Sequence, residues 1–121
     1  MSAGPPSSLR VLIVEDEAII ALDLSDMIAD LGHVVVMVAN RIDIGMDFAK
    51  SGRLDLAILD MNIRGVLSFP IADVLRDQSI PFIFASGYGE RGLIDGFRDA
   101  HVLTKPYNIE TLGRMVATAT M

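Results

Sequence analysis

The sequence has no cysteine and no tryptophan, and aromatic residues make up only 6% of its 121 positions. Without cysteine, disulfides, thiolate nucleophiles and zinc–thiolate sites are excluded. The chain also lacks an apolar run long enough to cross a bilayer. Residues 1–8 have neither the basic start nor the apolar stretch of a secretory signal. We therefore expect a cytoplasmic protein that does not associate with a membrane.

Basic residues are scarce as well. Ten Lys and Arg stand against sixteen Asp and Glu, which gives a net charge of −6. A nucleic-acid backbone selects for clustered Lys and Arg, so we expect no direct DNA binding. The length fits one domain. We expect a disordered lead-in over residues 1–8, rich in Gly, Pro and Ser, and a single domain over 9–121, with no room for a separate output domain.

Strand and helix patterns alternate along the rest of the chain. The expected strands are short and apolar on both faces, which is typical of a parallel sheet covered by helices on each side. The commonest winding of five such strands predicts an α/β fold with a flavodoxin-like, doubly wound parallel sheet of order 2-1-3-4-5. We place strands at 9–14, 33–39, 54–59, 80–85 and 101–104, and helices at 18–31, 41–50, 70–77 and 109–119, with Gly32 as a C-cap and Asn40 and Asn108 as N-caps.

Polar residues follow the strands at the points where they end. Ligands of open α/β sheets bind at this edge. The positions are Glu15, Asp16 and Glu17 after the first strand, Asp60 after the third, Ser86 after the fourth and Lys105 after the fifth.

Clustered carboxylates repel one another unless a cation joins them. Oxygen ligands without nearby His or Cys favour Mg²⁺ over zinc, and Mg²⁺ prefers a site completed by phosphate oxygens. A carboxylate beside Mg²⁺ can attack a phosphoryl group while the metal and a lysine neutralise its oxygens. The edge is therefore predicted to be a Mg²⁺-dependent phosphoryl-transfer site, where the hydroxyl of Ser86 holds a further oxygen.

Four local strings at these strand ends resemble the receiver family of response regulators, and the resemblance runs from Leu9 to the end of the chain. It implies a phosphorylated signalling protein of a bacterial two-component system, which assists its own phosphorylation and dephosphorylation and is no conventional enzyme. The strings are Val11–Glu17, Leu59–Asn62, Ala85–Gly87 and Thr104–Tyr107.

The resemblance also implies a role for each residue and a set of partners. A histidine kinase would donate the phosphoryl group, and the output would be a protein contact or onward phosphotransfer. By position, Asp60 is the phosphoacceptor, Glu15 and Asp16 are the acidic pair that holds Mg²⁺, the backbone carbonyl of Asn62 is a metal ligand, Ser86 is the switch hydroxyl and Lys105 is the lysine typical of the family.

A narrower resemblance lies in Phe84–Tyr88, which is similar to the FAT GUY subgroup of receivers, often stand-alone proteins paired with kinases of the HWE or HisKA2 type. Two departures from an ordinary receiver accompany it. Val102 occupies the place of the usual aromatic switch residue. Four glycines between positions 87 and 96 predict that the fourth helix is short, frayed or missing. We therefore expect the switch to run through Ser86–Gly96.

Each residue has an alternative explanation when taken alone. Acidic residues start helices, Asp and Ser occur in turns, and most lysines are solvated. Gly87–Gly92 matches a dinucleotide fingerprint, although it follows the fourth strand and not the first. A Mg²⁺-dependent phosphatase of the haloacid dehalogenase kind also uses an aspartate nucleophile, but that family has a second Asp where this chain has Asn62. Nucleotide binding and phosphatase activity remain as alternatives.

Overall fold

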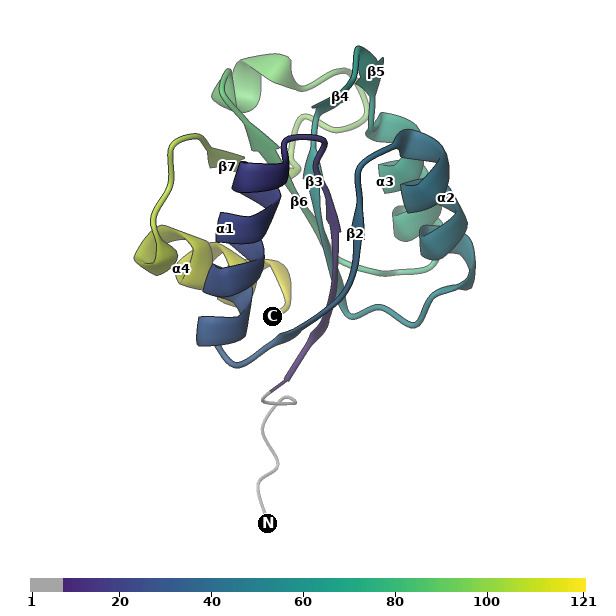
Figure 1. The fold of residues 1–121 in the computed structure, drawn as a ribbon. Coiled ribbons are helices and arrows are strands. Elements are labelled where there is room, and N and C mark those ends of the chain that lie inside the picture. The colour runs from purple at the N-terminus through teal and green to yellow at the C-terminus, as the bar shows by residue number, and fades with distance from the viewer. Residues whose placement is uncertain (1–7) are drawn as a thin grey trace.

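Five parallel strands form the centre of the fold (Figure 1). The computed structural model describes residues 8–121, so the expected lead-in lies outside the described residues except for Ser8. The sheet has the order β2-β1-β3-β6-β7, which confirms the predicted flavodoxin-like order 2-1-3-4-5. Its strands are β1 (Arg10–Val14), β2 (Val34–Ala39), β3 (Leu56–Asp60), β6 (Phe82–Ser86) and β7 (His101–Thr104).

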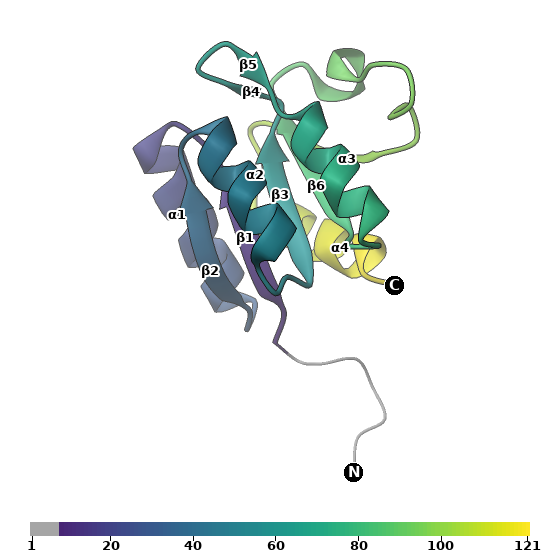
Figure 2. The same ribbon diagram turned by 90° about the vertical axis from the view of Figure 1, so that its right-hand side faces the viewer.

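Helices cover both faces of this sheet. Residues on alternate positions of a strand point to opposite faces, so β1 contributes to two cores. Val11 and Ile13 pack with α1 and α4, whereas Leu12 and Val14 pack with α2 and α3 (Figures 1 and 2). The four helices are α1 (Ala18–Asp30), α2 (Ile42–Ser51), α3 (Phe69–Asp77) and α4 (Ile109–Ala119).

Of the predicted helix caps, Asn108 is confirmed, Gly32 lies one residue beyond the C-cap Leu31, and Asn40 is wrong. Asn108 caps α4, since its side chain accepts a hydrogen bond from the Thr111 N–H at 2.9 Å. Gly32 follows α1 with a φ of 92°. The prediction that Asn40 caps α2 was wrong, because Arg41 takes the N-cap position. Arg41 also pairs with Asp43 in the first turn at 2.9 Å, an interaction that the sequence pattern did not show.

The connection from β3 to α3 is more ordered than predicted. We placed no strand between residues 59 and 70, but the chain forms an antiparallel hairpin of β4 (Asn62–Ile63) and β5 (Val66–Leu67). Ile63 is buried and belongs to the same core as α2 and α3. Strands of two residues carry no readable alternation of apolar and polar side chains, so the sequence pattern could not reveal them.

The connection from β6 to β7 contains no α-helix among the described residues. A 3₁₀ helix, η1 (Gly89–Gly92), is its only helical turn there. Leu93 and Phe97 are buried and anchor this connection in the core. The expectation that the fourth helix is short, frayed or missing is confirmed, since only the 3₁₀ turn is present in its place among the described residues. Across residues 8–121, no helix has the length and apolar character needed to span a membrane.

Candidate functional site

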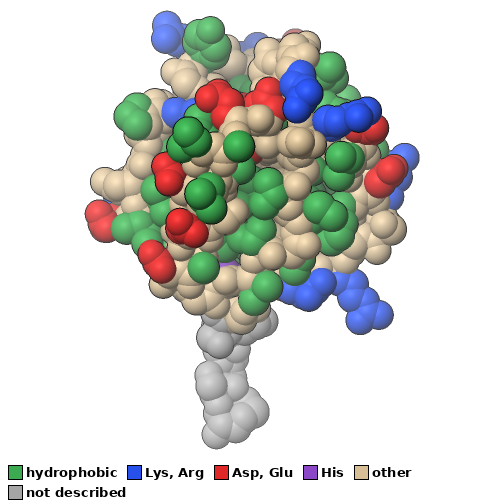
Figure 3. Space-filling model, viewed as in Figure 1, with side chains coloured by type: hydrophobic (Ala, Val, Ile, Leu, Met, Phe, Trp, Pro, Cys, Tyr) green, Lys and Arg blue, Asp and Glu red, His purple; other side chains and the backbone are tan. Residues whose placement is uncertain are grey.

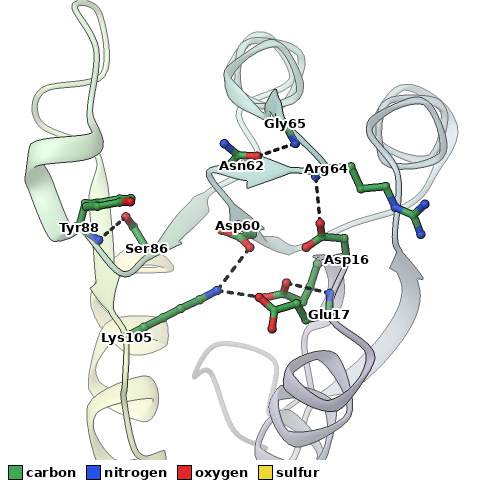
Figure 4. A network of polar contacts seen from close by, with 10 residues as sticks. Asp16, Glu17, Asp60, Asn62, Arg64, Gly65, Ser86, Tyr88 and Lys105 are labelled. Carbon is green, nitrogen blue, oxygen red and sulfur yellow. Dashed lines mark hydrogen bonds and ion pairs between the residues drawn. The ribbon is translucent and has the colours of Figure 1, made fainter.

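The polar residues singled out in the sequence meet at one edge of the sheet (Figure 4). Glu15 and Asp16 follow β1, and Asp60 is the last residue of β3. The pairing of β6 with its neighbours then brings Ser86 and Lys105 to the same edge, since Asp60 lies beside Ala85 in the register. The predicted convergence is therefore observed for these five residues.

Three carboxylates form the floor of the site. Glu15, Asp16 and Asp60 each offer one oxygen, and these oxygens lie within 4.8 Å of one another. Glu15 is buried, whereas the other two are half-buried. Glu17, the third acidic residue of the triplet, is exposed and contributes only its backbone N–H, which donates to the Glu15 carboxylate at 3.2 Å. Three of the four predicted carboxylates thus share the site.

Lys105 is the one cation that reaches this floor among the described residues. Its Nζ lies 3.2 Å from Glu15 Oε1 and 3.3 Å from Asp60 Oδ2. Burial lowers the pKa of Lys105, but the attraction of Asp60 and Glu15 outweighs burial and raises the pKa above its usual value. The ammonium therefore stays charged and neutralises part of the cluster.

The surroundings of Glu15 favour the protonated form of its carboxyl group. Its pKa is raised from 4.5 to about 7, mainly by burial and also by the nearby Asp60 charge, while the Glu17 N–H and Lys105 act in the opposite direction. A single lysine thus leaves the three carboxylates with excess negative charge. Hard oxygen donors with excess negative charge fit a small divalent cation. The cluster is consistent with Mg²⁺ binding.

Ser86 completes the edge at the end of β6. Its side chain is buried, and its Oγ accepts a hydrogen bond from the Tyr88 N–H at 3.0 Å. A hydroxyl that accepts in this way keeps its own proton available to donate. Tyr88 itself points away from the core and is 75% exposed. Ser86 can therefore offer a hydrogen bond to an anion at this edge.

Asn62 lies in the hairpin above the carboxylates. Its side chain is exposed, and Oδ1 accepts a hydrogen bond from the Gly65 N–H at 2.8 Å. Next to it, the Arg64 N–H donates to Asp16 Oδ2 at 2.9 Å. The sequence pattern indicated only the backbone carbonyl of Asn62 and gave no sign of Arg64. A role played by a backbone N–H leaves no signal in the type of side chain.

The glycine-rich string after β6 does not form a dinucleotide site. In such sites the fingerprint opens an α-helix whose N-terminus holds the phosphates. Here Gly87 and Tyr88 form a turn, and Gly89–Gly92 is a single 3₁₀ turn. The literal match to the fingerprint therefore has no structural counterpart.

Comparisons with known proteins agree on one family. The family described as "Response regulator receiver domain" matches residues 11–117. Over 107 residues the chain is 31% identical to the transcriptional regulatory protein PdtaR of Mycobacterium tuberculosis, covering 85% of this chain and 52% of that protein. Over 115 residues it is 31% identical to the phyllosphere-induced regulator PhyR of Methylorubrum extorquens, covering 91% and 43%. The chain thus spans about half the length of these relatives.

Solved structures extend the comparison. The solution structure of SdrG from Sphingomonas melonis Fr1 aligns with a TM-score of 0.85 and 33% identity, over 97% of this chain and 100% of that one. The BeF3-activated conformation of SdrG, from Pseudomonas melonis Fr1, aligns with a TM-score of 0.79 and 34% identity, over 93% and 96%. These similarities favour neither nucleotide binding nor a haloacid dehalogenase-like phosphatase.

Proposed function

The chain belongs to the response regulator receiver family, the phosphorylated signalling module of two-component systems, and from that membership we propose that Asp60 is its phosphoacceptor. The observation that supports this proposal is the position of Asp60. It ends the central strand β3, lies within 4.8 Å of two further carboxylates and pairs with Lys105. The donor is the phosphohistidine of a histidine kinase.

The reaction transfers a phosphoryl group between two side chains. A carboxylate oxygen of Asp60 attacks the phosphorus, a P–O bond forms, and the P–N bond to the donor histidine breaks, so that the electron pair stays on the departing imidazole. Lys105 pairs with a phosphoryl oxygen, and the Ser86 hydroxyl donates to another. Holding these groups in place before the reaction lowers its barrier, because no reorganisation is then needed.

Mg²⁺ is the cofactor of this reaction in our proposal. When bound, it neutralises negative charge on the phosphoryl oxygens. Glu15, Asp16 and Asp60 would hold it through their carboxylates, and Asn62 through its backbone carbonyl. The raised pKa of Glu15 supports this assignment, since a buried carboxyl with excess negative neighbours is ionised by a cation.

The switch in our proposal is the segment Ser86–Gly96. Val102 is half-buried and cannot undergo the rotation of an aromatic ring. In contrast, the segment begins at Ser86, continues through a short 3₁₀ turn and contains four glycines. A phosphoryl group that binds the Ser86 hydroxyl would contact the first residue of this segment, while Lys105 would hold the group from the position after β7.

The exposed apolar surface near the site supports a protein as the phosphoryl donor. Ile19 and Leu22 on α1 are 77% and 61% exposed, and hydrophobic side chains gather on the face of the molecule that Figure 3 shows. A groove beside Lys105 adds Ile20, Met27 and Tyr107 to the apolar surface. Exposed apolar surface next to a reactive site is typical of protein contacts. We propose a kinase of the HWE or HisKA2 type, on the likeness of Phe84–Tyr88 to the FAT GUY subgroup.

Phosphorylation is tested by intact-mass spectrometry after incubation with acetyl phosphate and Mg²⁺. The wild-type chain should gain one phosphoryl group, and Asp60→Asn should gain none. Asp73→Asn, on the exposed face of α3, is the matched control and should be labelled like the wild type. Labelling of Asp60→Asn at the wild-type rate would refute the assignment.

The metal is tested by thermal unfolding. Mg²⁺ at millimolar concentration should raise the melting temperature of the wild type, because it binds only the folded chain. Asp16→Asn should reduce that rise. Lys105→Ala should keep or tighten metal binding, since a competing cation is removed, while it impairs the response to phosphorylation. A melting temperature that does not change when Mg²⁺ is added would count against the metal site.

A further inference from the structure

The hairpin β4–β5 contacts the carboxylate of Asp16 through the backbone N–H of Arg64. We propose that the side-chain amide of Asn62 is a positioning group for Mg²⁺ binding: it braces the Arg64–Gly65 turn, whose N–H holds the carboxylate of Asp16. The inference rests on the proposed function, because it takes Asp16 as a metal ligand. It gives Asn62 a second role beside that of its backbone carbonyl.

The turn needs a brace because of its backbone. Arg64 and Gly65 connect the two short strands and both have positive φ, 53° and 85°. Gly65 adopts this region at no steric cost, but Arg64 carries a Cβ and does not. The Asn62 Oδ1 accepts a hydrogen bond from the Gly65 N–H. This bond stabilises the turn in which Arg64 has its unfavourable conformation.

The rest of the hairpin fixes where the turn lies. Ile63 is 1% exposed and packs into the core. At the base of the hairpin, the Ser68 N–H donates to the Met61 carbonyl at 2.9 Å. The turn is thus tied to the core at one strand and to the start of α3 at the other. Its N–H groups have a defined position relative to Asp60, which directly precedes Met61.

Asp16 receives its orientation from this turn. Its Oδ2 accepts the Arg64 N–H at 2.9 Å, although the two residues are 48 positions apart. Within residues 8–121, the Asp16 carboxylate has no other hydrogen-bond partner. A carboxylate that is held through one oxygen loses less rotational freedom when it binds a cation. Second partners of this kind typically change metal affinity by roughly ten- to a hundredfold.

The test measures the Mg²⁺ dissociation constant of the full chain by isothermal titration calorimetry. Asn62→Ala keeps the backbone carbonyl but removes the brace, and it should raise the dissociation constant roughly tenfold. Gly65→Ala should act in the same direction. Its Cβ would meet no atom within 4 Å, so the effect comes from the φ of 85° alone. The two variants change the turn without touching Asp16.

Asn108→Ala is the matched control. Asn108 makes the same kind of hydrogen bond in the cap of α4, where its Oδ1 accepts from the N–H three residues later at 2.9 Å. In the absence of Mg²⁺, Asn108→Ala should lower the melting temperature about as much as Asn62→Ala does. It should leave the Mg²⁺ dissociation constant unchanged. The double variant Asn62→Ala with Arg64→Gly should regain most of the affinity, because glycine needs no brace at positive φ.

The outcomes separate this inference from the proposed function. If the wild type binds Mg²⁺, Asp16→Asn loses it and Asn62→Ala binds like Asn108→Ala, the inference fails and the metal site stands. If neither Asp16→Asn nor Asn62→Ala differs from the wild type, or the wild type does not bind Mg²⁺, both fail. If Asn62→Ala does not fold, Gly65→Ala decides the question by the same measurement, and an unchanged dissociation constant overturns the inference.

Discussion

Two connections flank Asp60, and they are held in different ways. The hairpin side, residues 61–68, is fixed by hydrogen bonds to Asp16 and within its own turn. The connection from β6 to β7, residues 87–100, is fixed by the apolar side chains of Leu93 and Phe97. Hydrogen bonds specify where individual backbone atoms lie, whereas apolar contacts specify only that a side chain is buried. One side of the site is thus suited to hold an ion and the other to move.

The apolar anchor of the second connection is centred on Phe97. The centroid of its ring lies 5.1 Å from the ring centroid of Phe69 and 5.9 Å from that of Phe84. The Arg76 guanidinium lies 4.2 Å from the ring centroid and donates to the Gly96 carbonyl at 2.9 Å. Between Phe97 and Ser86, the chain has four glycines and the exposed Tyr88. The connection is secured at its far end and lightly held near the site.

Removing the apolar anchor should have the largest effect. Phe97→Ala should lower the free energy of unfolding by about 3–5 kcal/mol, as is usual for a buried phenylalanine. Urea denaturation measures this loss. Leu67→Ala, in the hairpin and 48% exposed, is the control and should cost far less. Equal losses for the two variants would contradict the distinction between the two sides.

The carboxylate floor between the two sides should respond to pH. The folded-state pKa of Glu15 is raised from 4.5 to about 7, so the folded chain binds a proton more tightly than the unfolded chain in this range. Without Mg²⁺, the free energy of unfolding should therefore rise as pH falls from above 7 towards 4.5, by on the order of 2 kcal/mol.

Glu15→Gln should remove this dependence, as measured by urea denaturation at several pH values. Saturating Mg²⁺ should weaken it, because the cation favours the ionised carboxyl. A wild-type stability that falls over the same range as pH decreases would show that Glu15 is not the titrating group.

Amide hydrogen exchange should separate the two sides directly. In the unphosphorylated chain, the amide hydrogens of residues 87–96 should exchange faster than those of Asn62–Leu67. Most of the backbone of residues 87–96 lies outside regular structure. Beryllofluoride with Mg²⁺ should slow exchange in 87–96 by roughly tenfold, which corresponds to about 1.4 kcal/mol. Changes confined to the hairpin would reverse the roles that we assign to the two sides.

Gly92→Ala should have the smallest effect. A Cβ there would lie 2.6 Å from Met61 Sδ, so the long Met61 side chain must shift. We expect a loss of about 1 kcal/mol or less, because methionine adapts readily to changes in packing. Met61→Ala should absorb the added methyl group, so the double variant should show no further loss from Gly92→Ala. Additive losses would place the clash elsewhere.

The sequence was most informative where chemistry depends on side-chain type. The five strands follow from buried apolar runs, and their order places Asp60 between Glu15 and Ser86 at one edge. The missing fourth helix followed from its glycines. By contrast, the hairpin depends on two-residue strands and on a backbone N–H of Arg64. The N-cap of α2 depends on which of two adjacent residues, Asn40 or Arg41, leaves the helical conformation first. Neither leaves a periodic signal.

The ion pair between Lys105 and Glu15 joins residues 90 positions apart. Lys105 follows β7, the edge strand, while Glu15 follows β1, and β3 and β6 lie between them. During synthesis the acidic residues therefore emerge from the ribosome long before their lysine. In a nascent chain without β7, Lys105 would not yet be available to neutralise the three carboxylates or to pair with a phosphoryl group. If Lys105 holds the phosphoryl group as we propose, a chain that ends before β7 would not accept one efficiently.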